Sequence, residues 1–129
     1  MFEREFGIDK RCGLTFTGIN RIYIGRKNQA YKLEQSPLAN PFVIGKHGSR
    51  EYVVEVLYRR WLWEQVKEGM VGKPNAAWDE LKFLQAREKR LIEKYDCDCL
   101  TLTCWCKESE LCHGDVIIRC LKWMAKNNL

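Results

Sequence analysis

The pattern of apolar and polar positions in the first third of the chain predicts little regular structure. Short alternating runs at 14–17 and 21–24 are rich in β-branched and aromatic residues, so both are expected to be strands. The polar residues 1–12 are expected to be loosely ordered. Residues 27–48 contain two prolines and two glycines and predict a long irregular loop, and loops of that length are often functional.

Helical periodicity appears in three later segments. Ser49 and Asn75 are suitable N-caps for helices that continue to about Lys67 and to Tyr95. Residues 99–106 alternate as a strand does, and a last helix begins near Cys112. The charged run 87–90 is expected to lie largely on the solvent side of its helix. The predicted apolar faces are Val54, Leu57, Tyr58, Trp61 and Leu62, then Leu81, Leu84, Leu91, Ile92 and Tyr95, and finally Val116, Ile117, Cys120, Leu121 and Met124.

This order of elements predicts an α/β fold. Two strands, a loop, two helices, a strand and a helix suggest a small single-domain sandwich, with a short, mostly parallel or mixed sheet packed by about three helices. If the last strand is parallel to an earlier one, the two middle helices form the crossover. The length of 129 residues and the absence of internal repeats indicate one domain over 1–129.

Composition narrows the class of protein. The chain is 46% hydrophobic and 30% charged, which is typical of a globular protein and not of a disordered one. No apolar run is long enough to cross a membrane, and the charged N-terminus is unlike a secretory signal, so a cytoplasmic location is expected. The net charge of +5 permits an anionic ligand or nucleic acid but does not require one.

The seven cysteines carry the most specific chemical signal, because five of them lie within residues 97–112. Clustered thiols in a reducing compartment indicate metal binding or catalysis in preference to disulfides. Cys104, Cys106, Cys112 and His113 form a candidate zinc site, although two adjacent residues rarely bind the same ion. Cys97 or Cys99 could replace one of these ligands.

A reactive thiol is the second interpretation of the cluster. Cys112 lies at a predicted helix N-terminus, where the macrodipole is expected to lower the pKa of a thiol. His113 and Asp115 are close enough in sequence to assist it, so these three residues are the catalytic candidates. Cysteines can also be simple buried apolar residues, and this interpretation is strong for Cys12 and Cys120.

A second group of candidates lies in the long loop and at its ends. Arg26 follows a predicted strand, and Arg50 begins a helix whose free N–H groups favour an anion. Asn40 and Lys46 lie between them in the loop. These four residues are predicted to bind an anionic group, but the glycine spacing matches neither a Walker loop nor a dinucleotide-binding motif.

Several of these motifs together resemble a known family. Ile22-Tyr-Ile-Gly-Arg26, Ser36-Pro-Leu-Ala-Asn-Pro-Phe42, Arg50, Leu102-Thr-Cys-Trp-Cys106 and Cys112-His-Gly-Asp115 are similar to the uncharacterised family called domain of unknown function 4326. The resemblance covers roughly residues 14–124 and implies a phage or bacterial cytosolic protein, without implying an activity. This chain departs from the family in the loop 107–111, which has no proline, and in the extra Cys97 and Cys99.

Three functional classes remain open. The first is an enzyme-like protein that acts on a nucleotide, nucleoside or nucleic-acid base, with the Cys/His cluster as zinc ligands or chemical groups. The second is a non-enzymatic module, stapled by zinc, that binds nucleic acid or a host protein. The third is a metal-free scaffold in which Trp61, Trp63 or Trp78 forms an oligomer interface. No membrane partner is expected, and the oligomeric state is left open.

Overall fold

The computed structural model describes residues 5–10, 16–18, 20–95, 99–106 and 110–129, with the side chains of 5–10, Tyr95 and Cys99 excepted. Within these residues the chain forms three strands, β1 (Glu5–Lys10), β2 (Arg21–Tyr23) and β3 (Cys99–Cys104). The helices are a π-helical segment, η1 (Tyr52–Tyr58), that continues directly into α1 (Arg59–Met70), then α2 (Ala76–Tyr95) and α3 (His113–Lys126). The predicted α/β class is therefore confirmed.

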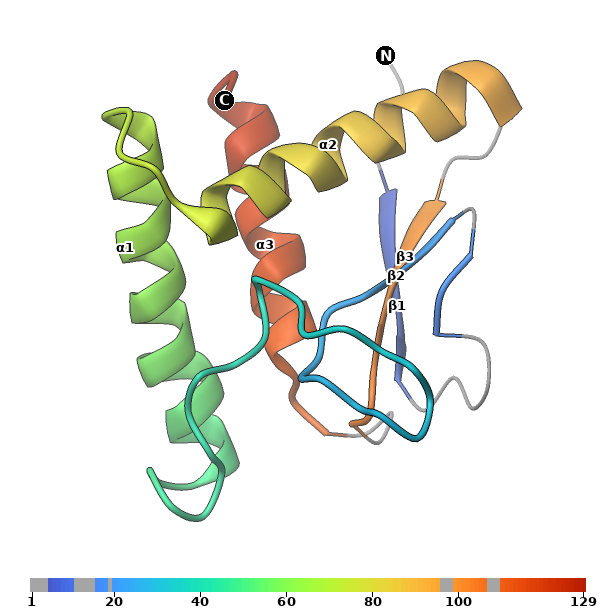
Figure 1. Ribbon diagram of the computed structural model, residues 1–129. Coiled ribbons are helices and arrows are strands. Elements are labelled where there is room, and N and C mark those ends of the chain that lie inside the picture. Colours follow the sequence, from blue (N-terminus) through green and yellow to red (C-terminus); the bar gives the residue numbers. More distant parts are fainter. Residues whose placement is uncertain (1–4, 11–15, 19, 96–98, 107–109) are drawn as a thin grey trace.

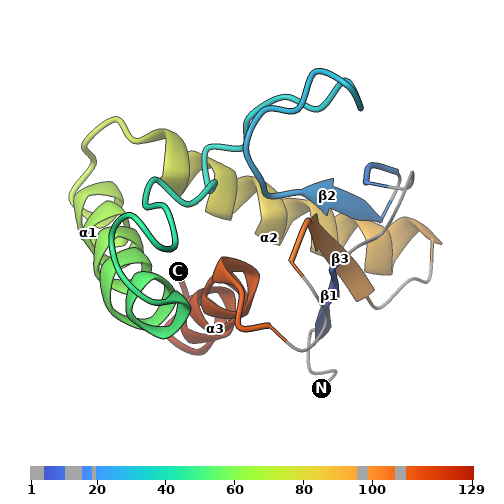
Figure 2. The ribbon, with the colours of Figure 1, turned by 90° about the horizontal axis from the view of Figure 1, so that it is seen from below.

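The sheet is fully parallel and has the order β1-β3-β2, so the last strand lies in the middle. Lys10 pairs with Cys104, and Tyr23 pairs with Thr103. Because β2 and β3 are parallel, η1, α1 and α2 form the crossover between them, as expected. In both views α3 lies between α1 and the strands, and α2 runs from the end of α1 toward the sheet (Figures 1 and 2).

The N-terminal prediction was wrong in one respect. Residues 5–10, expected to be loose, form β1, and the backbone of this strand is paired along its whole length with β3. The strand expected at 14–17 lies partly outside the described residues, and Phe16 and Thr17 do not belong to a strand. Residues 5–10 include a glycine and an aspartate, which have low strand propensity, so the pairing with β3 decides their conformation.

The predicted helix starts agree with the structure. The Ser49 Oγ accepts a hydrogen bond from the Tyr52 N–H (3.3 Å), and the Asn75 Oδ1 accepts one from the Trp78 N–H (2.9 Å). Both side chains therefore satisfy free N–H groups at a helix start. Among the described residues, no helix is long and apolar enough to cross a membrane.

The core lies where the helices meet β3, and most of the predicted apolar faces point into it. It contains Val54, Tyr58, Leu62, Leu81, Leu84, Leu91, Leu100, Leu102, Val116, Ile117, Leu121 and Met124. One charged residue departs from the expectation, because Glu88 of the run 87–90 is fully buried. It follows Leu84 by one helical turn and therefore shares the core-facing side of α2.

Candidate functional site

The candidate site lies at the edge of the sheet where the strands end. All three strands are parallel, so their carboxyl ends share this edge, and open α/β sheets often bind ligands there. β3 ends at Cys104, and Ile24 follows β2. The N-terminal ends of α3 and η1 lie at the same end of the molecule, together with the loop that precedes η1 (Figure 1).

Three of the predicted metal ligands come together at this edge. The Sγ atoms of Cys104, Cys106 and Cys112 all lie within 4.8 Å of one another, and those of Cys104 and Cys112 are 3.3 Å apart. Zinc–sulfur bonds of ~2.3 Å in a tetrahedral site place two sulfurs about 3.8 Å apart. The thiol trio, as we call these three residues, could therefore hold a metal ion.

Cys112 is placed by the start of α3. It is the N-cap residue, and its Sγ accepts a hydrogen bond from the Gly114 N–H (3.3 Å). The Asp115 carboxylate accepts one from the Cys112 N–H (3.0 Å), which completes a reciprocal cap. Asp115, a predicted catalytic residue, thus holds the helix start and does not line the site.

His113 lies beside the thiol trio and has a defined tautomer. One ring nitrogen, Nε2, lies 2.8 Å from the Ile24 carbonyl oxygen, which can only accept, so Nε2 carries the proton. In the neutral ring Nδ1 then has a lone pair, and it lies 3.7 Å from the Cys112 Sγ. Burial lowers the pKa of His113 and favours this neutral form. Among the described residues, the group of mutually close donor atoms comprises only the three thiols.

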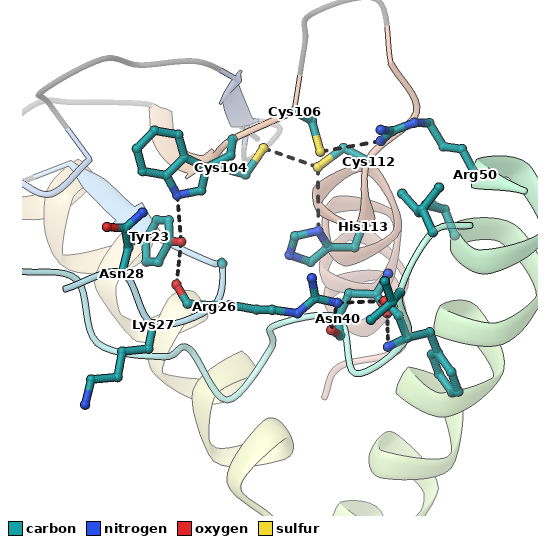
Figure 3. Close-up of a pocket in the computed structure, with 16 residues that line it drawn as sticks. Tyr23, Arg26, Lys27, Asn28, Asn40, Arg50, Cys104, Cys106, Cys112 and His113 are labelled. Atoms are coloured by element: carbon teal, nitrogen blue, oxygen red, sulfur yellow. Dashed lines mark hydrogen bonds between the residues drawn. The ribbon is translucent and has the colours of Figure 1, made fainter. Parts of the chain in front are cut away.

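Arg50 adds a positive charge on the Cys106 side of the trio. Its guanidinium lies 3.7 Å from the Cys106 Sγ, donates to the Leu111 carbonyl oxygen (3.1 Å) and forms a 2.8 Å ion pair with Glu110. Figure 3 shows this side chain reaching the trio from the start of the helix that contains η1. Arg50, predicted to bind an anion, is thus in contact with a sulfur.

The three thiols differ in their pKa values. Hydrogen bonds from Cys104 and Cys112, and then Arg50, lower the pKa of Cys106 to about 2. The bond to Cys106 raises the pKa of Cys104 to about 12, and contacts with Cys104 and Cys106 raise that of Cys112. In the coupled trio these shifts favour ionisation of Cys106 before that of Cys104 and Cys112. The direction of this pKa shift at Cys112 is opposite to the lowering expected at a helix N-terminus, and the neighbouring thiols are its main cause.

The suggested substitute ligands do not join the trio in the described part of the chain. Cys99 begins β3 and pairs with Glu5, whereas Cys104 ends it. At ~3.3 Å per residue the two positions are about 16 Å apart, so Cys99 cannot replace a ligand. Cys97 lies outside the described residues.

The trio forms one side of a pocket of about 400 Å³, which we call the cysteine pocket. The predicted residues Arg26, Asn40, Arg50 and His113 also line it, and Lys46 does not. Figure 3 shows the cysteines on one side of the pocket and Arg26 across from them. The full lining is Tyr23, Gly25, Arg26, Lys27, Asn28, Asn40, Phe42, Val43, Ile44, Arg50, Val54, Cys104, Trp105, Cys106, Cys112 and His113.

Two of these residues fix the loop at the pocket. The Arg26 Nη2 donates hydrogen bonds to the carbonyl oxygens of Asn40 and Phe42, both at 2.7 Å. The Asn40 Oδ1 accepts one from the Phe42 N–H (2.9 Å), which forms an Asx turn. Arg26 therefore shapes the loop and also brings a permanent positive charge to the pocket.

Sequence analysis missed Tyr23, Lys27 and Trp105 as pocket residues. The Trp105 Nε1 donates to the Tyr23 hydroxyl (2.9 Å), which in turn donates to the Arg26 carbonyl oxygen (2.6 Å). Gly25 permits this arrangement, since a Cβ there would lie 2.4 Å from the Tyr23 hydroxyl oxygen. Two features of the sequence could have indicated these residues. Trp105 lies between two candidate ligands, and Lys27 directly follows Arg26.

Similarity to known proteins identifies a family but no activity. No curated protein and no solved structure is significantly similar to the chain. The family model described as domain of unknown function (DUF4326) matches residues 11–123. This match covers most of the chain and confirms the resemblance seen in the motifs. The chain therefore belongs to the family called domain of unknown function 4326.

Proposed function

We propose that this protein binds zinc through Cys104, Cys106 and Cys112 and acts on a nucleotide-like anionic ligand in the cysteine pocket. The observation that carries the proposal is the convergence of three Sγ atoms, all within 4.8 Å of one another, in the lining of that pocket. Catalytic zinc sites characteristically have three protein ligands and leave one coordination position open.

The residues around the trio support an open site in preference to a closed one. In the part of the chain that the structure describes, no fourth metal-ligating side chain belongs to the trio. Cys106 is only half-buried, and it lines the pocket with its two partners. An open coordination position would therefore be directed to the space where a ligand binds.

Four charged or titratable pocket residues, Arg26, Lys27, Arg50 and His113, have a role in this proposal. Zinc, when bound, would act as a Lewis acid. Arg50 would offset the negative charge of the three thiolates, and Arg26 and Lys27 would attract an anionic ligand. The His113 Nδ1 lone pair could accept a proton. Thiolate ligands persist in a reducing compartment, which fits the cytoplasm of a bacterial or phage-infected cell.

A specific observation also favours the second candidate, a structural zinc in a module that binds nucleic acid or a host protein. Cys104 and Cys112 are fully buried and join the end of β3 to the start of α3. A metal there would close the intervening loop and stabilise the fold.

Elemental analysis of protein purified under reducing conditions tests zinc binding. We expect about one zinc per chain, as for a mononuclear site. Cys104→Ser, Cys106→Ser and Cys112→Ser should each lower the zinc content. Cys120→Ser is the matched control, because this half-buried thiol lies on α3 outside the trio. If no metal is bound by the native protein, the zinc proposal fails and thiol chemistry at Cys106 takes its place.

Cobalt substitution distinguishes an open site from a structural one. An open site predicts that small anions such as cyanide, and nucleotides, shift the visible absorption of the cobalt protein. A closed structural site predicts no shift, together with unfolding when the metal is chelated. The second result would favour the binding module.

A further inference from the structure

An aromatic cluster lies next to the cysteine pocket and has no part in metal binding. The ring of Trp105 lies 4.3 Å from that of Phe16, centroid to centroid, with an interplanar angle of 40°. Tyr31 packs against Trp105 at 5.1 Å and against Phe16 at 5.7 Å. Phe16 and Tyr23 meet edge to face at 5.6 Å. Together with Leu33, Phe16 and Tyr23 form a second, smaller core beneath Trp105.

Trp105 is held in place and still exposed. Phe16 is buried against one side of the indole, and the hydrogen bond from Nε1 to the Tyr23 hydroxyl fixes the orientation of the ring. Trp105 nevertheless remains 43% exposed and lines the cysteine pocket. The part of the indole that Phe16 and Tyr31 leave exposed is therefore accessible to a planar group, and the orientation of the ring is already set.

The backbone that bears two cationic residues, Arg26 and Lys27, lies close to this indole. The same Tyr23 hydroxyl that accepts from Trp105 donates to the Arg26 carbonyl oxygen (2.6 Å), so the backbone that bears Arg26 and Lys27 is near the ring. In Figure 3 Tyr23, Asn28 and Lys27 lie on the side of the pocket opposite to Arg50. Lys27 is exposed and lines the pocket, so its ammonium group can approach an anion there.

We propose that the pocket recognises a phosphorylated nucleoside, whose base stacks on Trp105 and whose phosphate is held by Lys27 and Arg26. A fixed aromatic face beside cationic side chains is the arrangement that binds bases without reading their sequence. The chemistry is shared by free nucleotides and by the ends of nucleic-acid strands. This inference rests on the proposed function for the location of the ligand, but base stacking itself does not require zinc.

Binding measurements with matched ligands test this proposal. The probes are AMP, GMP, CMP and UMP, with ribose 5-phosphate as the ligand that lacks a base and adenosine as the one that lacks a phosphate. We expect at least one nucleotide to bind in the micromolar to millimolar range by calorimetry. Ribose 5-phosphate should bind at least about tenfold more weakly, because stacking of one base is lost.

Variants then assign the stacking to Trp105. Trp105→Ala should weaken nucleotide binding about tenfold or more, whereas Trp105→Tyr keeps an aromatic face and should retain most of it. Trp63→Ala is the matched control, because Trp63 is also 43% exposed but does not line this pocket. Equal losses in Trp105→Ala and Trp63→Ala, or equal binding of AMP and ribose 5-phosphate, would overturn the proposal. So would the absence of binding by all four nucleotides at millimolar concentration.

Two further readouts separate the possible outcomes. A short single-stranded oligonucleotide that binds more tightly than any mononucleotide, and is also weakened by Trp105→Ala, would support stacking and identify nucleic acid as the source. Zinc content, measured on the same samples, should be unchanged in Trp105→Ala. Normal zinc without nucleotide binding overturns this inference alone, and nucleotide binding without zinc overturns only the metal proposal.

Discussion

The cysteine pocket and a second hollow of the molecule share tryptophan and arginine side chains but differ in what those side chains surround. The second hollow, the helix groove, has a volume of about 640 Å³. It lies between the helical segment of η1 and α1 and the helix α3, and Trp63 and Trp123 meet there edge to face at 5.0 Å. It is lined by Glu55, Val56, Arg59, Arg60, Leu62, Trp63, Val116, Arg119, Cys120 and Trp123.

The two regions are built differently, and this explains their chemistry. The groove is formed by residues within continuous helices, and an ion pair joins two of these helices, between Arg119 of α3 and Glu55 of η1 at 2.5 Å. Its one cysteine, Cys120, is isolated, and burial raises its pKa to about 12. The pocket instead forms where β2, β3 and α3 begin or end. The chain passes there from the end of β3 to the start of α3, so the thiols of Cys104, Cys106 and Cys112, which are close in sequence, converge, and Arg50 joins them from a distant part of the chain.

The largest expected difference between the two regions is in metal-linked stability. Cys112→Ser should remove zinc-dependent stabilisation, which is about 4 kcal/mol where free zinc exceeds its Kd about a thousandfold. Serine is itself a good N-cap, so the start of α3 should survive and the loss should report the metal. Cys120→Ser should keep the zinc-dependent part of the free energy of unfolding. Urea unfolding with and without a chelator measures this stabilisation. Identical unfolding curves for the native protein under both conditions would contradict the prediction.

Thiol reactivity in the metal-free protein should show the next largest difference. Cys106 and Cys120 are both half-buried, but the pKa of Cys106 is lowered to about 2 and that of Cys120 is raised to about 12. Since the thiolate is the nucleophile, we expect iodoacetamide to modify Cys106 at least about a hundredfold faster at neutral pH.

The pH dependence sharpens this comparison. The rate at Cys106 should stay flat from weakly acid to weakly alkaline pH, because this thiol is already ionised there. The rate at Cys120 should rise with pH, because its thiolate fraction is still increasing. Mass spectrometry of modified peptides measures both rates, and Cys106→Ser removes the fast phase. Faster modification of Cys120 would contradict the charge distribution in the trio.

A third comparison concerns the close packing at the pocket. Gly25→Ala would place a Cβ 2.4 Å from the Tyr23 hydroxyl oxygen and displace the ring that holds Trp105. We expect a destabilisation of about 2 kcal/mol, typical of overpacking, together with weaker nucleotide binding. Gly18→Ala is the control, since its nearest contact would be an ordinary 3.9 Å to Arg21. Thermal unfolding measures both variants, and equal melting temperatures would show that Tyr23 can move without cost.

Elements with strong local signals could be predicted from the sequence. Periodic apolar residues and the caps Ser49 and Asn75 identified two helices, and the capping residue Cys112 marked the start of the third. The thiol trio was also foreseeable, because alternation in β3 and a short loop restrict where Cys104, Cys106 and Cys112 can lie. Their predicted roles as zinc ligands are still predictions.

Features that depend on tertiary neighbours could not be predicted in this way. β1 has only two apolar residues in alternation, Phe6 and Ile8, beside a glycine and an aspartate of low strand propensity, and it is held by its pairing with β3. The raised pKa of Cys112 comes from two thiols that meet it only after folding. Trp105 becomes a pocket residue because Phe16 and Tyr23, more than 80 positions earlier in the chain, support its ring. The secondary-structure propensities of single residues carry no information about these tertiary contacts.

The smallest expected effect lies in the helix groove. Trp63→Ala removes the edge-to-face contact with Trp123, which should cost about 1 kcal/mol. Trp63 is 43% exposed and lines the helix groove, whereas the thiol trio lines the cysteine pocket, so zinc content and the reactivity of Cys106 should not change. Trp105→Ala provides the opposite case: nucleotide binding should change, and the packing in the helix groove should not. If Trp63→Ala lowers the zinc content, the packing of α1 on α3 controls the position of Cys112, and the two regions are coupled through α3.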